Sequence, residues 1–167
     1  MTVPGRNGAR GRIRRSRREN GRARIVSGLA FPLEVLIRHI PVSHQSASSA
    51  SKDRWRRTVA EHARACVGAL SDWTFLDDRP LSLTILYFPP GSMQGDIDNI
   101  AKLIMAALIG VVYLDDRVIE RLVVQKFEPA VAWHFQNPPP RLNDALETPP
   151  PAVYVRVDDD MQWRGVP

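Results

Sequence analysis

The chain has only one cysteine, Cys66, so it can form no internal disulfide, and a reducing compartment fits this composition. No apolar run reaches the roughly 18 residues that are needed to cross a bilayer. The first residues contain no apolar segment of the kind found in secretory signals. These absences exclude a disulfide-stabilised scaffold and a membrane protein, and they predict a cytoplasmic location.

Positive charge is concentrated near the start of the chain. Residues 1–28 carry nine arginines and one acid, Glu19, a net charge of +8 against +5 for the whole chain, so the remaining residues carry −3. This arm lacks apolar periodicity, which predicts disorder. It suits a polyanion, because neutralised phosphates release counterions. A solvated tail without a role and a transit peptide are the alternatives. Its candidate DNA-binding residues are Arg12, Arg14, Arg15, Arg17 and Arg18.

The remainder, residues 29–167, alternates strand-like and helix-like patterns and predicts one α+β domain. The expected elements are strands at 33–40, 81–88, 118–127 and 152–158, and helices at about 52–70 and 99–109. Their order, β-α-β-α-β-β, favours one mixed sheet with two helices packed on it. Residues 136–151 contain two proline triplets, so we expect a Pro-rich connecting loop there.

Both expected helices have an apolar face. The stripe of the first helix comprises Trp55, Val59, Ala63, Cys66, Val67 and Leu70, and that of the second comprises Ile100, Leu103, Ile104, Ala107 and Leu108. Ser51 is a candidate N-cap for the first helix, and Gly110 follows the second where a left-handed residue is expected. Arg54 and Arg57 lie off the first stripe, so they are further candidates for contact with DNA.

Aspartates gather around the second helix. Asp96 and Asp98 flank its start, Lys102 lies one turn after Asp98, and Asp115 and Asp116 follow a connection short enough to return them beside the helix N-terminus. Clustered carboxylates resist simultaneous ionisation unless a cation lies between them, and Mg²⁺ prefers such oxygen ligands. A bound Mg²⁺ polarises a phosphodiester and activates water, and a lysine neutralises charge in the transition state.

Each part of this pattern also has a structural interpretation. Asp98 or Asn99 can be an N-cap, and Asp96 is favoured near the positive end of a helix. Asp115 and Asp116 form a common turn signal, and Lys102 can be a solvated helix residue. The order and spacing of these residues together favour a catalytic site.

Three motifs in register resemble the RusA family of Holliday junction resolvases. In that family an Asp-x-Asp-Asn-Leu-x-Lys segment opens a helix, an aspartate pair follows a Gly-Val-aromatic turn, and a strand ending in lysine comes next. The present sequence has DIDNIAK at 96–102, GVVYLDD at 110–116 and a strand ending at Lys126. This match covers about 32 residues, and a weaker match extends from about Leu33 to Phe88.

The resemblance implies a Mg²⁺-dependent endonuclease that acts as a homodimer and nicks two strands of branched, four-way DNA. It implies that Asp96, Asp98 and Asp116 are the metal-binding catalytic acids and that Lys102 is the catalytic lysine. Asp115 is a weaker candidate for a metal ligand.

The chain also departs from the family, and other functions stay open. Lys126 is a candidate DNA contact. The family usually has Asn after a Pro-x-Ser segment, whereas His44 and Gln45 follow it here, so DNA contacts at this loop can differ. His44 is either a general base or a solvated loop residue. The alternative functions are a nuclease of broader specificity and a non-catalytic DNA-binding protein in which the arm binds DNA.

Overall fold

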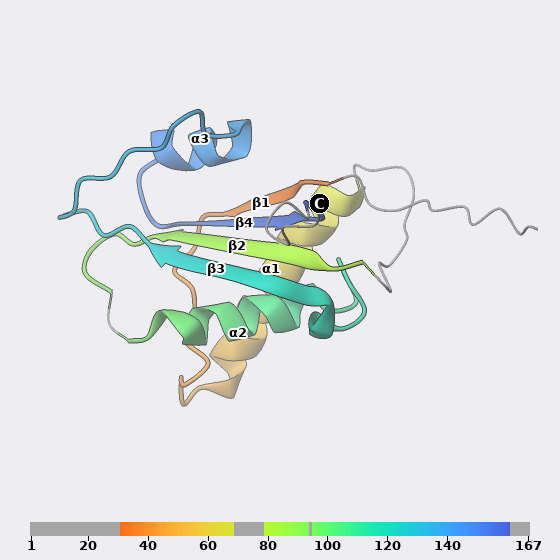
Figure 1. The fold of residues 1–167 in the computed structure, drawn as a ribbon. Helices are drawn as coiled ribbons and strands as arrows, with labels where there is room; N and C mark the ends of the chain where they lie inside the picture. The colour runs from red at the N-terminus through yellow and green to blue at the C-terminus, as the bar shows by residue number, and fades with distance from the viewer. Residues whose placement is uncertain (1–30, 69–78, 94, 161–167) are drawn as a thin grey trace, which may run out of the picture.

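A computed structural model describes residues 31–68, 79–93 and 95–160. The elements are β1 (Leu33–Ile37), α1 (Ser49–Gly68), β2 (Leu81–Phe88), α2 (Ile97–Leu108), the 3₁₀ turn η1 (Asp116–Val118), β3 (Ile119–Lys126), α3 (Pro140–Glu147) and β4 (Ala152–Asp158). The strands form one sheet in the order β1-β4-β2-β3, in which β3 is parallel to β2 and the other neighbours are antiparallel. The predicted α+β class with one mixed sheet is confirmed (Figure 1).

Helices α1 and α2 pack on one face of this sheet and against each other (Figure 1). Trp55 of α1, Ile104 of α2 and Val155 of β4 are almost completely buried in this core. The apolar stripe of α2 is confirmed, and so is that of α1 as far as it is described. Cys66 is partly buried there, which raises the pKa of its thiol, and Leu70 lies outside the described residues.

The Pro-rich segment contains a third helix, α3, so the prediction of a loop throughout 136–151 is wrong. Pro140 occupies the start of the helix, where its missing N–H costs nothing and its fixed backbone angle suits the first turn. Leu142 and Ala145 of α3 bury themselves with Leu86 and Tyr154 against the second face of the sheet. Contact with the apolar side chains of that face therefore stabilises a helix that the proline content of the segment does not predict.

The remaining boundaries differ by a few residues from the prediction. Strands β2 and β4 have the predicted bounds, whereas β1 ends at Ile37. Helix α1 begins at Ser49, and the hydroxyl of Ser48 accepts a hydrogen bond of 3.2 Å from the backbone N–H of Ser51. Ser48 is thus the capping residue, and the prediction that Ser51 caps α1 is wrong.

Two further predictions concern membrane spans and the arginine-rich arm. No helix within the described ranges is long and apolar enough to cross a membrane. The arginine-rich arm, with Arg12, Arg14, Arg15, Arg17 and Arg18, lies outside the described residues.

Candidate active site

The start of helix α2 exposes two aspartates. Asp96 occupies the N-cap position but makes no side-chain capping hydrogen bond, and Asp98 lies in the first turn of the helix. The helix begins two residues earlier than predicted, so the interpretation of Asp98 or Asn99 as the N-cap residue is wrong. Carboxylates in a first turn are favoured by the partial positive charge of the helix end. This end of α2 therefore tolerates two exposed acids.

Lys102 lies one turn further along α2 and contacts Asp98, as the spacing predicts. Its Nζ donates a hydrogen bond of 3.1 Å to Oδ2 of Asp98. This hydrogen bond holds the pKa of Asp98 below its ordinary value. The side chains of Lys102 and Asp98 are 55% and 62% exposed, so solvent screens the pair and its effect on stability is small. The contact holds an ammonium group beside a carboxylate on an exposed surface.

The turn after α2 leads to the second pair of aspartates. Gly110 adopts a φ of +72°, and the buried Tyr113 donates a hydrogen bond of 3.0 Å from its hydroxyl to the backbone carbonyl of Met105. Asp115 caps η1 and accepts hydrogen bonds from the backbone and the guanidinium of Arg117, at 2.6 to 2.9 Å. These bonds lower the pKa of Asp115 to about 2. Asp115 is thus already engaged by a cation of the protein.

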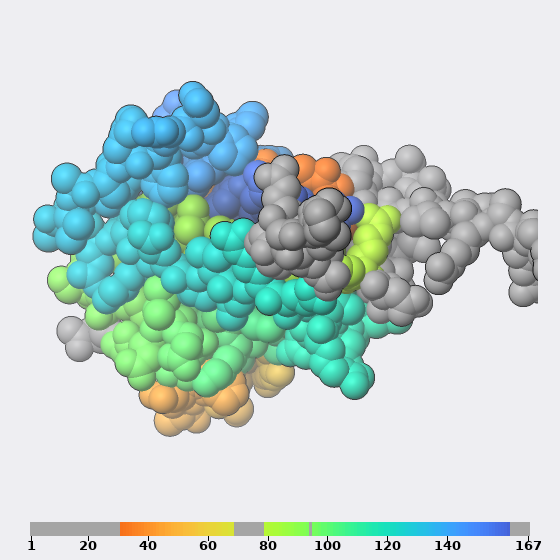
Figure 2. Space-filling view, in the orientation of Figure 1, coloured from red at the N-terminus to blue at the C-terminus, as the bar shows by residue number. Residues whose placement is uncertain are grey.

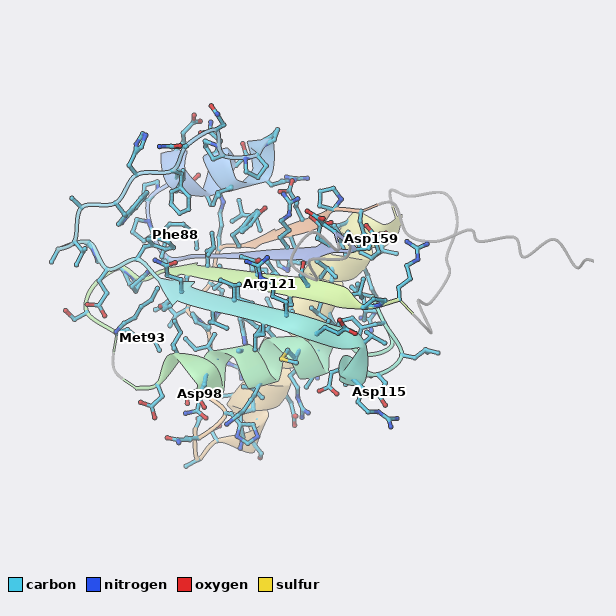
Figure 3. The ribbon with its side chains drawn as sticks, in the orientation of Figure 1. Phe88, Met93, Asp98, Asp115, Arg121 and Asp159 are labelled. Carbon is cyan, nitrogen blue, oxygen red and sulfur yellow. The ribbon has the colours of Figure 1, made fainter. Side chains whose placement is uncertain are left out.

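Asp116 lies beside the second half of α2. It shares a pocket with Met105 and Ala106. Burial of the Tyr113 hydroxyl raises the pKa of that group, and the negative charge of Asp116 raises it further. Figure 3 shows Asp98 and Asp115 at opposite ends of α2. The helical rise alone separates Asp98 from Met105 by roughly 10 Å. The prediction that the second aspartate pair returns beside the helix N-terminus is therefore wrong.

The topology explains this separation. Strands β2 and β3 are parallel, so α2 crosses over between them and must run in the opposite direction to both. Residues just before β3 then lie at the end of α2, far from its start. Accordingly, the described residues contain no group of three His, Cys, Asp or Glu side chains that can hold a metal ion. Asp96, Asp98 and Asp116 do not form one cluster within a single chain.

A pocket of about 610 Å³ between α1 and α2 brings Lys102 and Asp116 together. Its polar side chains are His44 from the loop before α1, Ser49, Lys52, Asp53 and Arg56 from α1, Lys102 from α2, and Asp116 from η1. The backbone N–H of His44 donates a hydrogen bond of 2.9 Å to the carbonyl of Asn99, which attaches this loop to α2. Figure 2 shows the first part of α1, in orange, against α2, in green, on the molecular surface.

The lining residues of α1 were not predicted as site residues. Lys52, Asp53 and Arg56 share one face of the helix because they lie three and four residues apart. That spacing is a signal in the sequence, but the apolar stripe on the other face of α1 does not reveal it. The predicted DNA contacts Arg54 and Arg57 are exposed, and neither lines this pocket.

Lys126 has a structural contact at the end of β3. Its Nζ lies 2.6 Å from a carboxylate oxygen of Glu128, and the same oxygen accepts a hydrogen bond of 3.1 Å from the backbone N–H of Met93. Lys126 and Glu128 therefore brace the loop that leads to Asp96.

A comparison with protein families identifies the class to which this fold and its exposed aspartates belong. The family model described as endodeoxyribonuclease RusA matches residues 32–132, which include α1, α2, η1 and β3. The match covers more than half of the chain, and the chain therefore belongs to the RusA endodeoxyribonuclease family. This family hydrolyses phosphodiester bonds of DNA, resolves Holliday junctions and binds branched DNA. No curated protein matches the chain.

Proposed function

We propose that the protein is a Mg²⁺-dependent endodeoxyribonuclease that resolves four-way DNA junctions by paired nicking, in recombination and repair. The observation that carries this proposal is the contact of Lys102 with Asp98 at the exposed start of α2, within the region that matches the family. Asp96 is exposed on the same helix end. The arrangement offers carboxylates and a lysine to a substrate phosphate on an accessible surface.

The donor chemistry at this end of α2 fits Mg²⁺. Mg²⁺ commonly binds one or two carboxylates and completes its coordination with water and substrate phosphate. Asp96 and Asp98 would supply these carboxylates, whereas Asp115 is occupied by Arg117. When bound, the ion supplies a Lewis acid for the phosphodiester and lowers the pKa of a coordinated water.

Lys102 would stabilise negative charge on the phosphate oxygens in the transition state. Its ammonium group is already held beside Asp98, so little reorganisation is needed when a phosphate arrives. A lysine keeps three donors on one nitrogen, so it can retain Asp98 and still donate to a phosphate oxygen. The hydrogen bond from Lys102 lowers the pKa of Asp98 and so favours the ionised carboxylate that a metal ligand requires.

Asp116 belongs to the proposed catalytic set, although it lies at the other end of α2. Symmetric paired nicks require two active sites, so we propose a C₂ homodimer. If the α2 helices of the two chains lie antiparallel in this dimer, Asp116 of one chain comes close to the start of the partner's α2, whereas the length of its own α2 separates it from Asp98. We therefore place Asp116 of one chain beside Asp96 and Asp98 of its partner.

The arginine-rich arm, residues 1–28, would add phosphate contacts that do not depend on DNA sequence. Arg54 and Arg57 would act in the same way from the exposed face of α1. These contacts would raise affinity without taking part in the chemistry.

One cleavage assay tests the proposed activity. Four-way junctions, flaps, linear duplexes and single strands are each incubated with the protein in Mg²⁺ and, as the matched control, in EDTA. We expect paired nicks in the four-way junction in Mg²⁺ only. Equal cleavage of all substrates would indicate a nuclease of broader specificity, and binding without cleavage would indicate a non-catalytic DNA-binding protein.

A further inference from the structure

We propose that the pocket between α1 and α2 is a phosphate-binding subsite for the cleaved DNA strand, with Lys52 and Arg56 as its phosphate contacts. This inference rests on the proposed function and adds to it the path of the strand beside Lys102. The ligand class is a DNA phosphodiester one or more positions away from the scissile phosphate. The two residues are thus positioning residues for the reaction.

The composition of the pocket fits a phosphate. Three cations, Lys52, Arg56 and Lys102, line it together with two acids, Asp53 and Asp116. The lining cations outnumber the lining acids by one, and Lys102 is also paired with Asp98 outside the lining. Lys52 and Arg56 are therefore the cations of the pocket that an anion would contact.

The contacts of the two α1 residues leave them able to bind an anion. Nζ of Lys52 is 3.5 Å from the backbone carbonyl of His44, and no carboxylate pairs with Lys52 in the part of the chain that the structure describes. Arg56 pairs with Asp53 one turn away, and their side chains are 47% and 55% exposed. An exposed pair of this kind is weak, and a guanidinium can keep a carboxylate while it donates to a phosphate oxygen.

The position of Lys102 links this pocket to the proposed catalytic centre. Lys102 lines the pocket and at the same time donates to Asp98. A phosphate in the pocket would therefore lie next to the group that we assign to the chemistry. The strand would run from the start of α2, past Lys102, and between α1 and α2.

The test is junction binding in EDTA over a range of salt concentrations, with Lys52→Ala, Arg56→Ala and the control Arg64→Ala. Arg64 is an exposed arginine of the same helix that does not line the pocket. Each lost phosphate contact should reduce the slope of the logarithm of the binding constant against the logarithm of the salt concentration by about 0.9. We expect this reduction for Lys52→Ala and Arg56→Ala, with Lys52→Arg restoring the slope, and no reduction for Arg64→Ala. If Lys52→Ala and Arg56→Ala kept the salt slope of the wild type, as expected for Arg64→Ala, the proposed subsite would be wrong.

A second measurement locates the phosphate. Single neutral methylphosphonates are placed around the cleavage position of the junction, and binding is measured for the wild type and Arg56→Ala. At one position near the cleavage site, the neutral linkage should weaken DNA binding by the wild type. The same linkage should not further weaken DNA binding by Arg56→Ala, which already lacks the contact. Additive losses at every position would contradict the contact. Both measurements omit Mg²⁺, so a protein that fails to cleave any DNA disproves the proposed activity without deciding the subsite.

Discussion

Lys102 donates a hydrogen bond of 3.1 Å to Asp98 and also lines the pocket that contains Asp116. The parallel β2-α2-β3 crossover keeps these two carboxylates of one chain at opposite ends of the helix, so Lys102 would act with Asp98 of its own chain and, in the proposed dimer, with the partner's Asp116. This assignment defines what the removal of Lys102 should change.

Replacement of Lys102 by alanine should lower the turnover of four-way junctions by about a hundredfold or more, the scale of losing one transition-state contact. The midpoint of thermal unfolding should barely change, because the side chain is exposed and its ion pair is screened. Single-turnover kinetics and calorimetry measure the two quantities. A variant that cleaves at the wild-type rate would make Lys102 a solvated helix residue.

The pKa of Asp98 should rise toward its ordinary value in Lys102→Met, because the hydrogen bond that lowers it is lost. A depressed pKa in the folded state adds stability that is present above the unfolded pKa and disappears as the pH falls through the folded pKa. The small stability advantage of the wild type over the variant should therefore be present near neutral pH and disappear in acid. Carboxyl ¹³C NMR titration measures the pKa, and an unchanged value would show that the contact is absent in solution.

Asp115 and Asp116 should respond differently to the same substitution. Asp115→Asn removes the partner of Arg117 at the start of η1 but no proposed catalytic group, so cleavage should persist within a few fold. Asp116→Asn should abolish metal-dependent cleavage. The two variants are matched in chemistry and adjacent in sequence. If Asp115→Asn were the inactive variant, the assignment of the pair would have to be reversed.

Mixed dimers test whether the active site uses two chains. A dimer of one Asp98→Asn chain and one Asp116→Asn chain contains one intact set of carboxylates if Asp116 acts on the partner, and none if it acts within its own chain. We therefore expect the mixed dimer to nick one strand of the junction, whereas each parent dimer is inactive. Differently tagged chains allow its purification. An inactive mixed dimer would refute the shared site.

Much of this architecture follows from local sequence patterns. The apolar stripes of α1 and α2 and the alternation in β4 are periodic, so burial could be predicted from spacing. The Asp98–Lys102 contact followed in the same way, because residues four apart meet on a helix. Helix α3 does not follow from such a pattern, because its prolines are typical of loops and its burial depends on Leu86 and Tyr154, which are distant in sequence. The position of Asp116 depends on strand direction, which no local pattern reveals.

The central claim is that Asp98 and Asp116 are metal-binding catalytic acids, and it is tested by binding in EDTA and cleavage in Mg²⁺ with Asp98→Asn and Asp116→Asn. Both variants should bind four-way junctions in EDTA at least as tightly as the wild type, because each presents less negative charge to the phosphates. Both should lose cleavage in Mg²⁺. If Asp98 only stabilised the start of α2 and Asp116 only stabilised the turn at η1, asparagine would substitute well for either aspartate. Retained cleavage in both variants would contradict the active site proposed for this protein.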